Sequence, residues 1–436
     1  MRIRRMNRRG ALAASAVVAT LALAACSVTG GAKANNPTAG STGGGGGPVT
    51  LNALFMKQAG YSEDDIAKMI TTFESQNPNI KVTPTFVAYE ALHDKIVTSA
   101  PAGTYDVVLM DVIWPAEFAS KGLIQDVTSR FPDSWKTDML GGALSAAQYQ
   151  GKYYGVPWGP STKLFYANTD MLAKVGATTA DVQTWDGVLT VAKKLKDQGI
   201  VQYPLAWSWS QAEALICDYA QMLGAFGGQF TDDSGKLIVN QGPGVQALEW
   251  MKKTMDDGLT NPASTTMLED DVSKTMASGQ AAMSLNWEST YRDLNDPSIS
   301  QVVGKVAVMP TPTGSTGAHP GVNGSMAWAI GAKSAHSDEA FKLIEFLSSE
   351  ENQDQFAVSQ MPNWKASYSK PDITKTNPDV FKAAGVAYDS LISRPEVPNY
   401  TQVSQILQVE IQNALLGKKT PQQAMDDAVA QANALK

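Results

Sequence analysis

Apolar and polar positions along the body of the chain follow two periods, and these predict strands separated by helices. Residues 49–56 alternate with a period of two, which is typical of a strand. Residues 62–78 repeat apolar positions at helical spacing behind a serine cap. Residues 79–87 and 105–111 predict two further strands, with a helix over 90–100 between them. This alternation predicts a doubly wound α/β sheet.

The second half of the body continues the alternation. A helix is predicted over 178–199, with Asp186 at its N-cap. Another helix is predicted over 267–280 and should end at Gly279, and residues 281–286 follow as a strand. Near the C-terminus, Thr420, Pro421 and Gln423 form the pattern of a capping box.

Prolines interrupt the pattern at two places. Pro157 and Pro160 break one apolar block into two strands, and a proline-containing segment at 310–314 ends another strand. We interpret residues 158–161 and 310–314 as crossings between two domains. A third crossing is expected near residues 360–363.

The N-terminus predicts export. Five arginines in the first ten residues precede a short apolar run, which is typical of a signal peptide over 1–25. Leu23-Ala24-Ala25-Cys26 resembles a bacterial lipobox, and the resemblance implies that Cys26 carries the lipid. An ordinary signal peptide is the alternative, and Arg8-Arg9 leaves twin-arginine export open. The glycine-rich residues 26–48 predict a flexible tether.

Charge and cysteine content exclude several function classes. The net charge of −7 becomes −12 once the five N-terminal arginines are removed, which argues against nucleic acid or an anionic membrane surface as the main partner. Cys217 is the only cysteine after Cys26, so no disulfide is expected. The three histidines are far apart, and no metal or cofactor motif is present. His93 is expected on a solvated helix face.

The ten tryptophans are the main chemical clue. Several stand at predicted loops and strand ends, beside carboxylates or amides. Flat aromatic rings suit the C–H faces of a sugar, while carboxylates and amides suit its hydroxyl groups. Asp111 and Trp114 follow a buried strand at its carboxyl end, where ligands of such sheets bind.

Several ordered segments carry a family resemblance. They include "YDVVLMDVIWPAEFASKGLIQDVT", "GKYYGVPWGPSTKLFYANTDML", "GQAAMSLNWESTYRDL" and "MPNWKASY". Together with the lipobox, they resemble the extracellular solute-binding proteins of carbohydrate ABC importers, over roughly residues 49–436. The resemblance implies a non-enzymatic receptor, anchored by lipid to the outer face of the cytoplasmic membrane, that passes a sugar to permease subunits.

The resemblance also implies a two-lobed periplasmic-binding-protein-like fold of type II. Each lobe is a doubly wound mixed sheet, and two or three hinge crossings join the lobes. The expected N-terminal lobe comprises residues 49–158 and 315–360, and the C-terminal lobe comprises 159–314 and 361–436. We expect a monomer with the ligand between its lobes.

The expected ligand-binding residues are aromatic, carboxylate or amide side chains at loops and strand ends. They are Gln58, Tyr61, Asp111, Trp114, Trp158, Trp207, Trp209, Trp287, Glu288, Asn323 and Trp364. Packing or helix capping is the alternative for each. Trp250 and Trp328 are expected in the core, and Trp185 is expected as a hydrophobic staple before its helix. No residue is expected to be catalytic.

Other functions remain open at the level of sequence. A secreted glycoside hydrolase could use Asp111, Glu213 or Glu288 as its acid pair. The same fold could bind a polyamine, which needs several acids in the cleft, or a peptide or an anion, and an anion would need arginines or helix N-termini. A surface lipoprotein without a ligand is a further alternative.

Overall fold

The computed structural model describes residues 47–57 and 60–435. The predicted signal peptide, the lipobox cysteine Cys26 and the predicted contact Gln58 lie outside the described residues, as does the predicted tether except for its last two residues.

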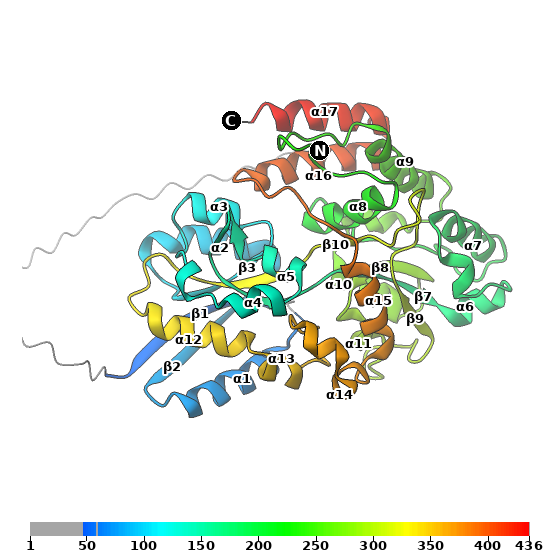
Figure 1. Ribbon diagram of the computed structural model, residues 1–436. Coiled ribbons are helices and arrows are strands. Elements are labelled where there is room, and N and C mark those ends of the chain that lie inside the picture. Colours follow the sequence, from blue (N-terminus) through cyan, green and yellow to red (C-terminus); the bar gives the residue numbers. More distant parts are fainter. Residues whose placement is uncertain (1–46, 58–59, 436) are drawn as a thin grey trace, which may run out of the picture. The chain divides into compact units, whose positions relative to one another are not determined.

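The described chain forms mixed α/β structure with helices packed around two main sheets (Figure 1). The strands are β1 (Val49–Met56), β2 (Ile80–Val87), β3 (Val107–Asp111), β4 (Gln148–Tyr149), β5 (Lys152–Tyr153), β6 (Val156–Gly159), β7 (Lys163–Asn168), β8 (Met283–Trp287), β9 (Val306–Met309), β10 (Gly321–Val322), β11 (Met326–Ile330) and β12 (Leu391–Ile392).

The helices differ widely in length. They are α1 (Glu63–Gln76), α2 (Tyr89–Ser99), α3 (Pro115–Ser120), α4 (Asp133–Asp138), α5 (Gly141–Ser145), α6 (Thr169–Lys174), α7 (Trp185–Asp197), α8 (Glu213–Ala225), α9 (Gly242–Asp256), α10 (Glu269–Ala277), α11 (Thr290–Leu294), α12 (Ser337–Ser348), α13 (Glu350–Gln355), α14 (Pro371–Thr374), α15 (Pro378–Tyr388), α16 (Tyr400–Leu415) and α17 (Pro421–Asn433).

The first sheet has five strands in the order β2-β1-β3-β11-β6. β1 pairs in parallel with β2 and β3, whereas β11 runs antiparallel to both β3 and β6. Helices α1 and α12 contact this sheet, and one apolar cluster, which includes the predicted core residue Trp328, surrounds it. The predicted doubly wound arrangement is confirmed, with β11, which comes much later in the chain, inserted between β3 and β6.

The second sheet consists of β7 with β8 and β9 on either side, all antiparallel. Two further apolar clusters surround it, and Trp250 lies in the larger one as expected. Trp185 lies in the same cluster as the first residue of α7, so its predicted position before the helix is wrong. Helices α9, α16 and α17 pack together beside this half (Figure 1). The chain passes from the first sheet to the second between β6 and β7, and it returns between β9 and β11. The lobe boundaries given above stay a prediction.

Local sequence signals account for the ends of several helices. Ser62 caps α1 and Thr420 caps α17, each within a complete capping box. Gly279 has a φ of +70°, which ends α10 as predicted. The cap predicted at Asp186 is wrong, because Thr184 accepts from the backbone N–H of Gly187 and Asp186 belongs to the first turn.

The expected break at Pro157 is also wrong. Pro157 lies within β6 and pairs with Ala327 of β11. Because β6 is the edge strand of its sheet, it pairs on one side only, and an edge strand tolerates a residue without an N–H. Pro160 does separate β6 from β7 as expected.

The described residues contain neither a membrane-spanning helix nor a cluster of metal ligands. Residues 47–57 and 60–435 contain no helix that is both long and apolar enough to cross a membrane. Within the same residues, no three histidine, cysteine or carboxylate side chains gather as a metal site would require.

Candidate functional site

A cavity of about 590 Å³ is lined by residues from both halves of the fold. The ends of β1 and β3 and helix α2 contribute from the first half, and α8, α10, β8 and α16 contribute from the second. β3 meets the cavity at its carboxyl end, which is where ligands of largely parallel α/β sheets bind. β8 also reaches the cavity with its last residues.

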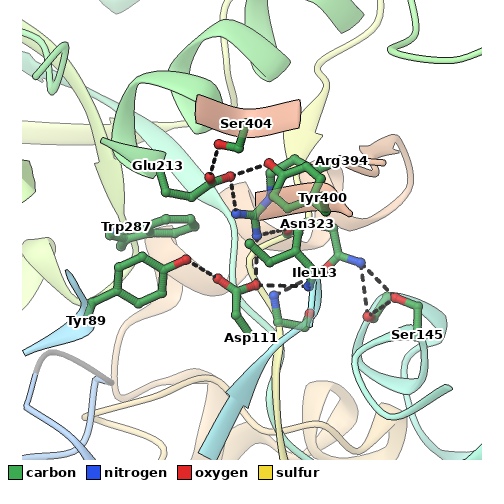
Figure 2. A network of polar contacts seen from close by, with 12 residues as sticks. Tyr89, Asp111, Ile113, Ser145, Glu213, Trp287, Asn323, Arg394, Tyr400 and Ser404 are labelled. Atoms are coloured by element: carbon green, nitrogen blue, oxygen red, sulfur yellow. Dashed lines mark hydrogen bonds and ion pairs between the residues drawn. The ribbon is translucent and has the colours of Figure 1, made fainter. Parts of the chain in front are cut away.

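Arg394 joins two carboxylates that belong to different halves. Its Nη2 lies 2.9 Å from Oδ1 of Asp111, at the end of β3, and its Nη1 lies 2.8 Å from Oε1 of Glu213, the first residue of α8. Nη2 also donates to the carbonyl oxygen of Asn323 at 3.1 Å. Figure 2 shows the guanidinium between the two carboxylates. All three charged residues line the cavity.

Hydroxyl groups complete this polar network. The hydroxyl of Tyr89 donates to Oδ2 of Asp111 at 2.7 Å. The hydroxyls of Tyr400 and Ser404, both on α16, donate to the carboxylate of Glu213 (Figure 2). The network therefore fixes the orientation of two carboxylates at the cavity surface.

Burial and ion pairing have opposite effects on the pKa values of these charged groups. Burial raises the pKa of Glu213, and Arg394, Ser404 and Tyr400 offset part of that rise. Burial also opposes the charge of Arg394, but Asp111 and Glu213 keep its pKa above the usual value. The side chain of Arg394 is only 1% exposed, so its charge depends on these two partners.

Trp287, the last residue of β8, offers a partly buried indole to the cavity. Its Nε1 donates to Oε1 of Glu269 at 3.3 Å. The ring lies against Gly324, where an added Cβ would come within 2.4 Å of the indole. Only a glycine leaves room for the ring in this position.

A second aromatic group faces the cavity from the first half. Tyr89 and Trp114 stack with ring centroids 5.8 Å apart and planes inclined by 17°. His93 packs against Trp114 and Phe118, and its Nε2 lies 3.0 Å from Oε2 of Glu117. The expected solvated position of His93 is therefore wrong, because α2 turns this side chain toward the aromatic group.

Four of the predicted contacts line the cavity: Asp111, Trp114, Trp158 and Trp287. Trp158 is only 2% exposed and packs mainly on Tyr61 and Trp328. Whether these four residues touch a ligand stays a prediction.

The structure does not bring Trp207, Trp209 or Trp364 to the cavity. Trp207 and Trp209 stack on each other at 5.5 Å, and both are fully buried in the core of the second half. They precede α8 in an extended segment instead of starting the helix. Trp364 is buried as well, with its Nε1 bonded to the carbonyl oxygen of Ser348. Apolar packing accounts for all three positions.

Tyr61, Glu288 and Asn323 also lie outside the cavity lining. Tyr61 is buried against Trp158. The side chain of Asn323 donates to the carbonyl of Gly142 and to Ser145, and accepts from the backbone of Ser325, so its polar atoms are used within the protein.

Glu288 directly follows β8 and contacts the segment between β6 and β7. Its carboxylate accepts from Ser161 Oγ at 2.8 Å, from the backbone N–H of Thr162 at 2.7 Å and from the hydroxyl of Tyr388 at 2.9 Å. Burial raises the pKa of Glu288 to about 7, although these three bonds favour the ionised form. The carboxylate thus holds the segment that connects β6 to β7.

Sequence reasoning missed Arg394, Tyr89 and Glu269 and considered Glu213 only as a hydrolase acid. One signal was available for Arg394, since the chain has only three arginines after residue 25. The convergence of three distant segments on that arginine, however, leaves no local pattern.

Comparisons with known proteins agree with this architecture. A family model described as "Bacterial extracellular solute-binding protein" matches residues 50–354. A probable ABC transporter-binding protein from Deinococcus radiodurans is 28% identical over 344 residues, which is 75% of this chain and 79% of that protein.

Solved structures extend the similarity over most of the chain. Maltose-bound MalE3 of T. maritima is 29% identical with a TM-score of 0.81, and the match covers 88% of this chain and 98% of that one. A solute-binding protein from Thermotoga lettingae TMO bound to alpha-D-tagatose is 25% identical with a TM-score of 0.79, over the same shares of the two chains.

Proposed function

The chain belongs to the family of bacterial extracellular solute-binding proteins, and we propose that it is a lipid-anchored receptor that binds a neutral sugar or oligosaccharide and delivers it to an ABC permease. As a member of this family it is a binding protein and not an enzyme. The alternative of a glycoside hydrolase is thereby set aside. Asp111 and Glu213 instead serve as the two partners of Arg394.

One observation carries the choice of a sugar. The cavity combines aromatic side chains, among them Trp114 and Trp287, with hydrogen-bonding carboxylates from both halves. Sugars need both kinds of surface. An anion is disfavoured, because Arg394 is already paired with two carboxylates. A ligand that contacts both lobes, 49–158 with 315–360 and 159–314 with 361–436, would stabilise their closed arrangement in a monomeric receptor.

A cationic solute is the second candidate, and the charge of the cavity favours it. Eight carboxylates line the cavity, against the two cationic side chains Lys274 and Arg394. This excess of acids is the feature that a polyamine or an amino sugar would require.

A ligand panel separates these candidates. The purified protein is titrated calorimetrically and melted with maltose, trehalose, D-tagatose, glucosamine, spermidine and sn-glycerol 3-phosphate. A true ligand raises Tm with the logarithm of its concentration once that concentration exceeds Kd, with a stabilisation of about 2.7 kcal/mol at 100 times Kd. Binding of maltose, trehalose or D-tagatose supports the proposal, whereas binding of spermidine or glucosamine alone supports the second candidate. Binding of the phosphate ester alone contradicts both.

Trp287→Ala is expected to weaken the binding of the sugar identified by this panel tenfold or more, which corresponds to about 1.4 kcal/mol, because the stacking surface is lost. Titration calorimetry measures the change. Trp135→Ala is the matched control, since Trp135 packs on Phe131 and Trp364 outside the cavity lining and its loss should leave Kd unchanged. An unchanged Kd in folded Trp287→Ala would assign Trp287 to packing alone.

Lipid attachment at Cys26 gives a further prediction. A bacterium that expresses the protein and is fed an alkyne-tagged fatty acid should label the wild type, and Cys26→Ser should lose the label because the acceptor thiol is gone. Cys217→Ser is the control, because Cys217 is buried and should not affect labelling. Absence of label on the wild type, or label on Cys26→Ser, would contradict the anchor.

A further inference from the structure

Lys163, the first residue of β7, carries a charge that is fully buried behind the cavity wall. Its Nζ lies 2.7 Å from Oδ1 of Asp218 and 2.8 Å from Oγ of Ser208, and both of these partners are themselves buried. Burial opposes the charge, yet Asp218 and Glu269 keep the pKa of Lys163 above its usual value. The lysine is therefore charged in the folded protein.

A buried ion pair is weak evidence for a stabilising role. Two apolar side chains of similar volume would fill this space at little cost or with a gain in stability. A purely structural role thus does not account for an ammonium group at this position. Its other contacts point toward the cavity wall.

Two residues of the cavity wall contact the same ammonium group. Nζ lies 3.2 Å from Oε1 of Glu269 and 5.2 Å from the ring centroid of Trp287. The same Oε1 accepts from Nε1 of Trp287 at 3.3 Å. Lys163, Glu269 and Trp287 form a closed triangle of contacts, and the last two residues line the cavity while Lys163 does not.

We propose that Lys163 is a positioning residue that holds the indole of Trp287 and the carboxylate of Glu269 in the orientation that receives the ligand. The ammonium attracts the electron-rich face of the indole and fixes Glu269, which in turn holds the indole nitrogen. With Gly324 against the ring edge, the indole is constrained on several sides before any ligand arrives. An indole that is already fixed in the free protein loses less conformational entropy when the ligand binds.

This inference rests on the proposed function for its effect on affinity, but the positioning itself can be measured without a ligand. The test variant is the double substitution Lys163→Met with Asp218→Asn, which removes both charges and leaves an amide oxygen at position 218 that can accept from Ser208. The matched control is Lys419→Met with Asp427→Asn. Lys419 also pairs with two carboxylates, Glu410 and Asp427, and none of the three residues lines the cavity.

The first readout is ¹⁹F NMR of the ligand-free protein labelled with 5-fluorotryptophan, in which Trp287→Phe assigns the Trp287 resonance. We expect one narrow resonance in the wild type and in the control, and a broadened or doubled one in the Lys163 variant. The second readout is calorimetric titration with maltose, for which we expect at least tenfold weaker binding by the Lys163 variant only.

An unchanged Trp287 resonance in a folded Lys163 variant, shown by a cooperative melt, would overturn the proposal. If that variant does not fold, Lys163→Met with Asp218→Leu replaces it, because apolar side chains of similar volume can fill the space of a buried ion pair at little cost. An unchanged Trp287 resonance there would equally overturn the proposal. Failure of the wild type to bind any sugar of the panel contradicts the proposed function, while the resonance still decides the role of Lys163.

Discussion

Arg394→Met is expected to lower the free energy of unfolding by about 3–5 kcal/mol at pH 7.5. The substitution leaves Asp111 and Glu213, which are both buried or nearly so, without their shared cation. Methionine approximates the volume of the arginine stem, so packing changes little and the unpaired charges dominate the cost. Urea denaturation followed by circular dichroism measures the loss.

The loss should become smaller as the pH falls. Burial already raises the pKa of Glu213, and Arg394 is the largest of the groups that lower it. Without Arg394 the pKa of Glu213 rises further, and the variant then protonates this carboxyl in mild acid. An unpaired carboxyl costs stability only while it is ionised, so the deficit is largest above that raised pKa and shrinks as the pH falls toward 5.

Two variants test the cause. Arg394→Met combined with Glu213→Gln should recover part of the stability at pH 7.5, because one unpaired charge is gone. Arg130→Met is the control, since the exposed pair of Arg130 with Asp338 should contribute less than about 1 kcal/mol. A deficit in Arg394→Met that is below 1 kcal/mol and independent of pH would contradict the view that Arg394 is a desolvated link between two carboxylates.

The parts of the fold that depend on neighbouring residues could be predicted from the sequence. The capping box of α17 and the buried face of α1, formed by Ile66, Met69, Ile70 and Phe73, follow from spacing within one helix. Strand β3 could be predicted equally well, because a short apolar run between polar turns is typical of a buried strand. These signals need no knowledge of the rest of the chain.

The residues of the site were harder to predict than the helices and strands, because burial of an aromatic residue depends on the whole fold. Trp207 and Trp287 both stand beside polar residues at the end of an apolar segment, yet only Trp287 lines the cavity. The difference arises from α9, whose Trp250 packs against Trp207 in the core. Arg394 escaped prediction for a similar reason, since its partners lie 283 and 181 residues away along the chain.

Glu288→Gln is expected to change how stability depends on pH. In the wild type, burial raises the pKa of Glu288 from 4.5 to about 7, and its three donors, Ser161, Thr162 and Tyr388, are all neutral. For a carboxyl with a raised pKa, the folded state binds more protons than the unfolded state between the two values. Its contribution to stability is therefore fully present below pH 4.5 and is lost as the pH rises toward 7.

Glutamine stays neutral throughout, and its amide can preserve the geometry by accepting from Thr162 and Tyr388 while donating to Ser161. The stability of Glu288→Gln relative to the wild type should thus rise by about 3 kcal/mol between pH 4.5 and pH 8. Urea denaturation at a series of pH values measures this difference.

Asp126→Asn is the matched control for the Glu288 experiment. Lys152 and Thr128 hold the pKa of Asp126 at about 2, so this carboxyl is ionised between pH 5 and pH 8. The difference in the free energy of unfolding between Asp126→Asn and the wild type should therefore be constant over this range. A constant difference for Glu288→Gln as well would mean that Glu288 is already ionised at pH 5. The three hydrogen bonds would then outweigh burial, and the segment that connects β6 to β7 would be held by a permanent negative charge.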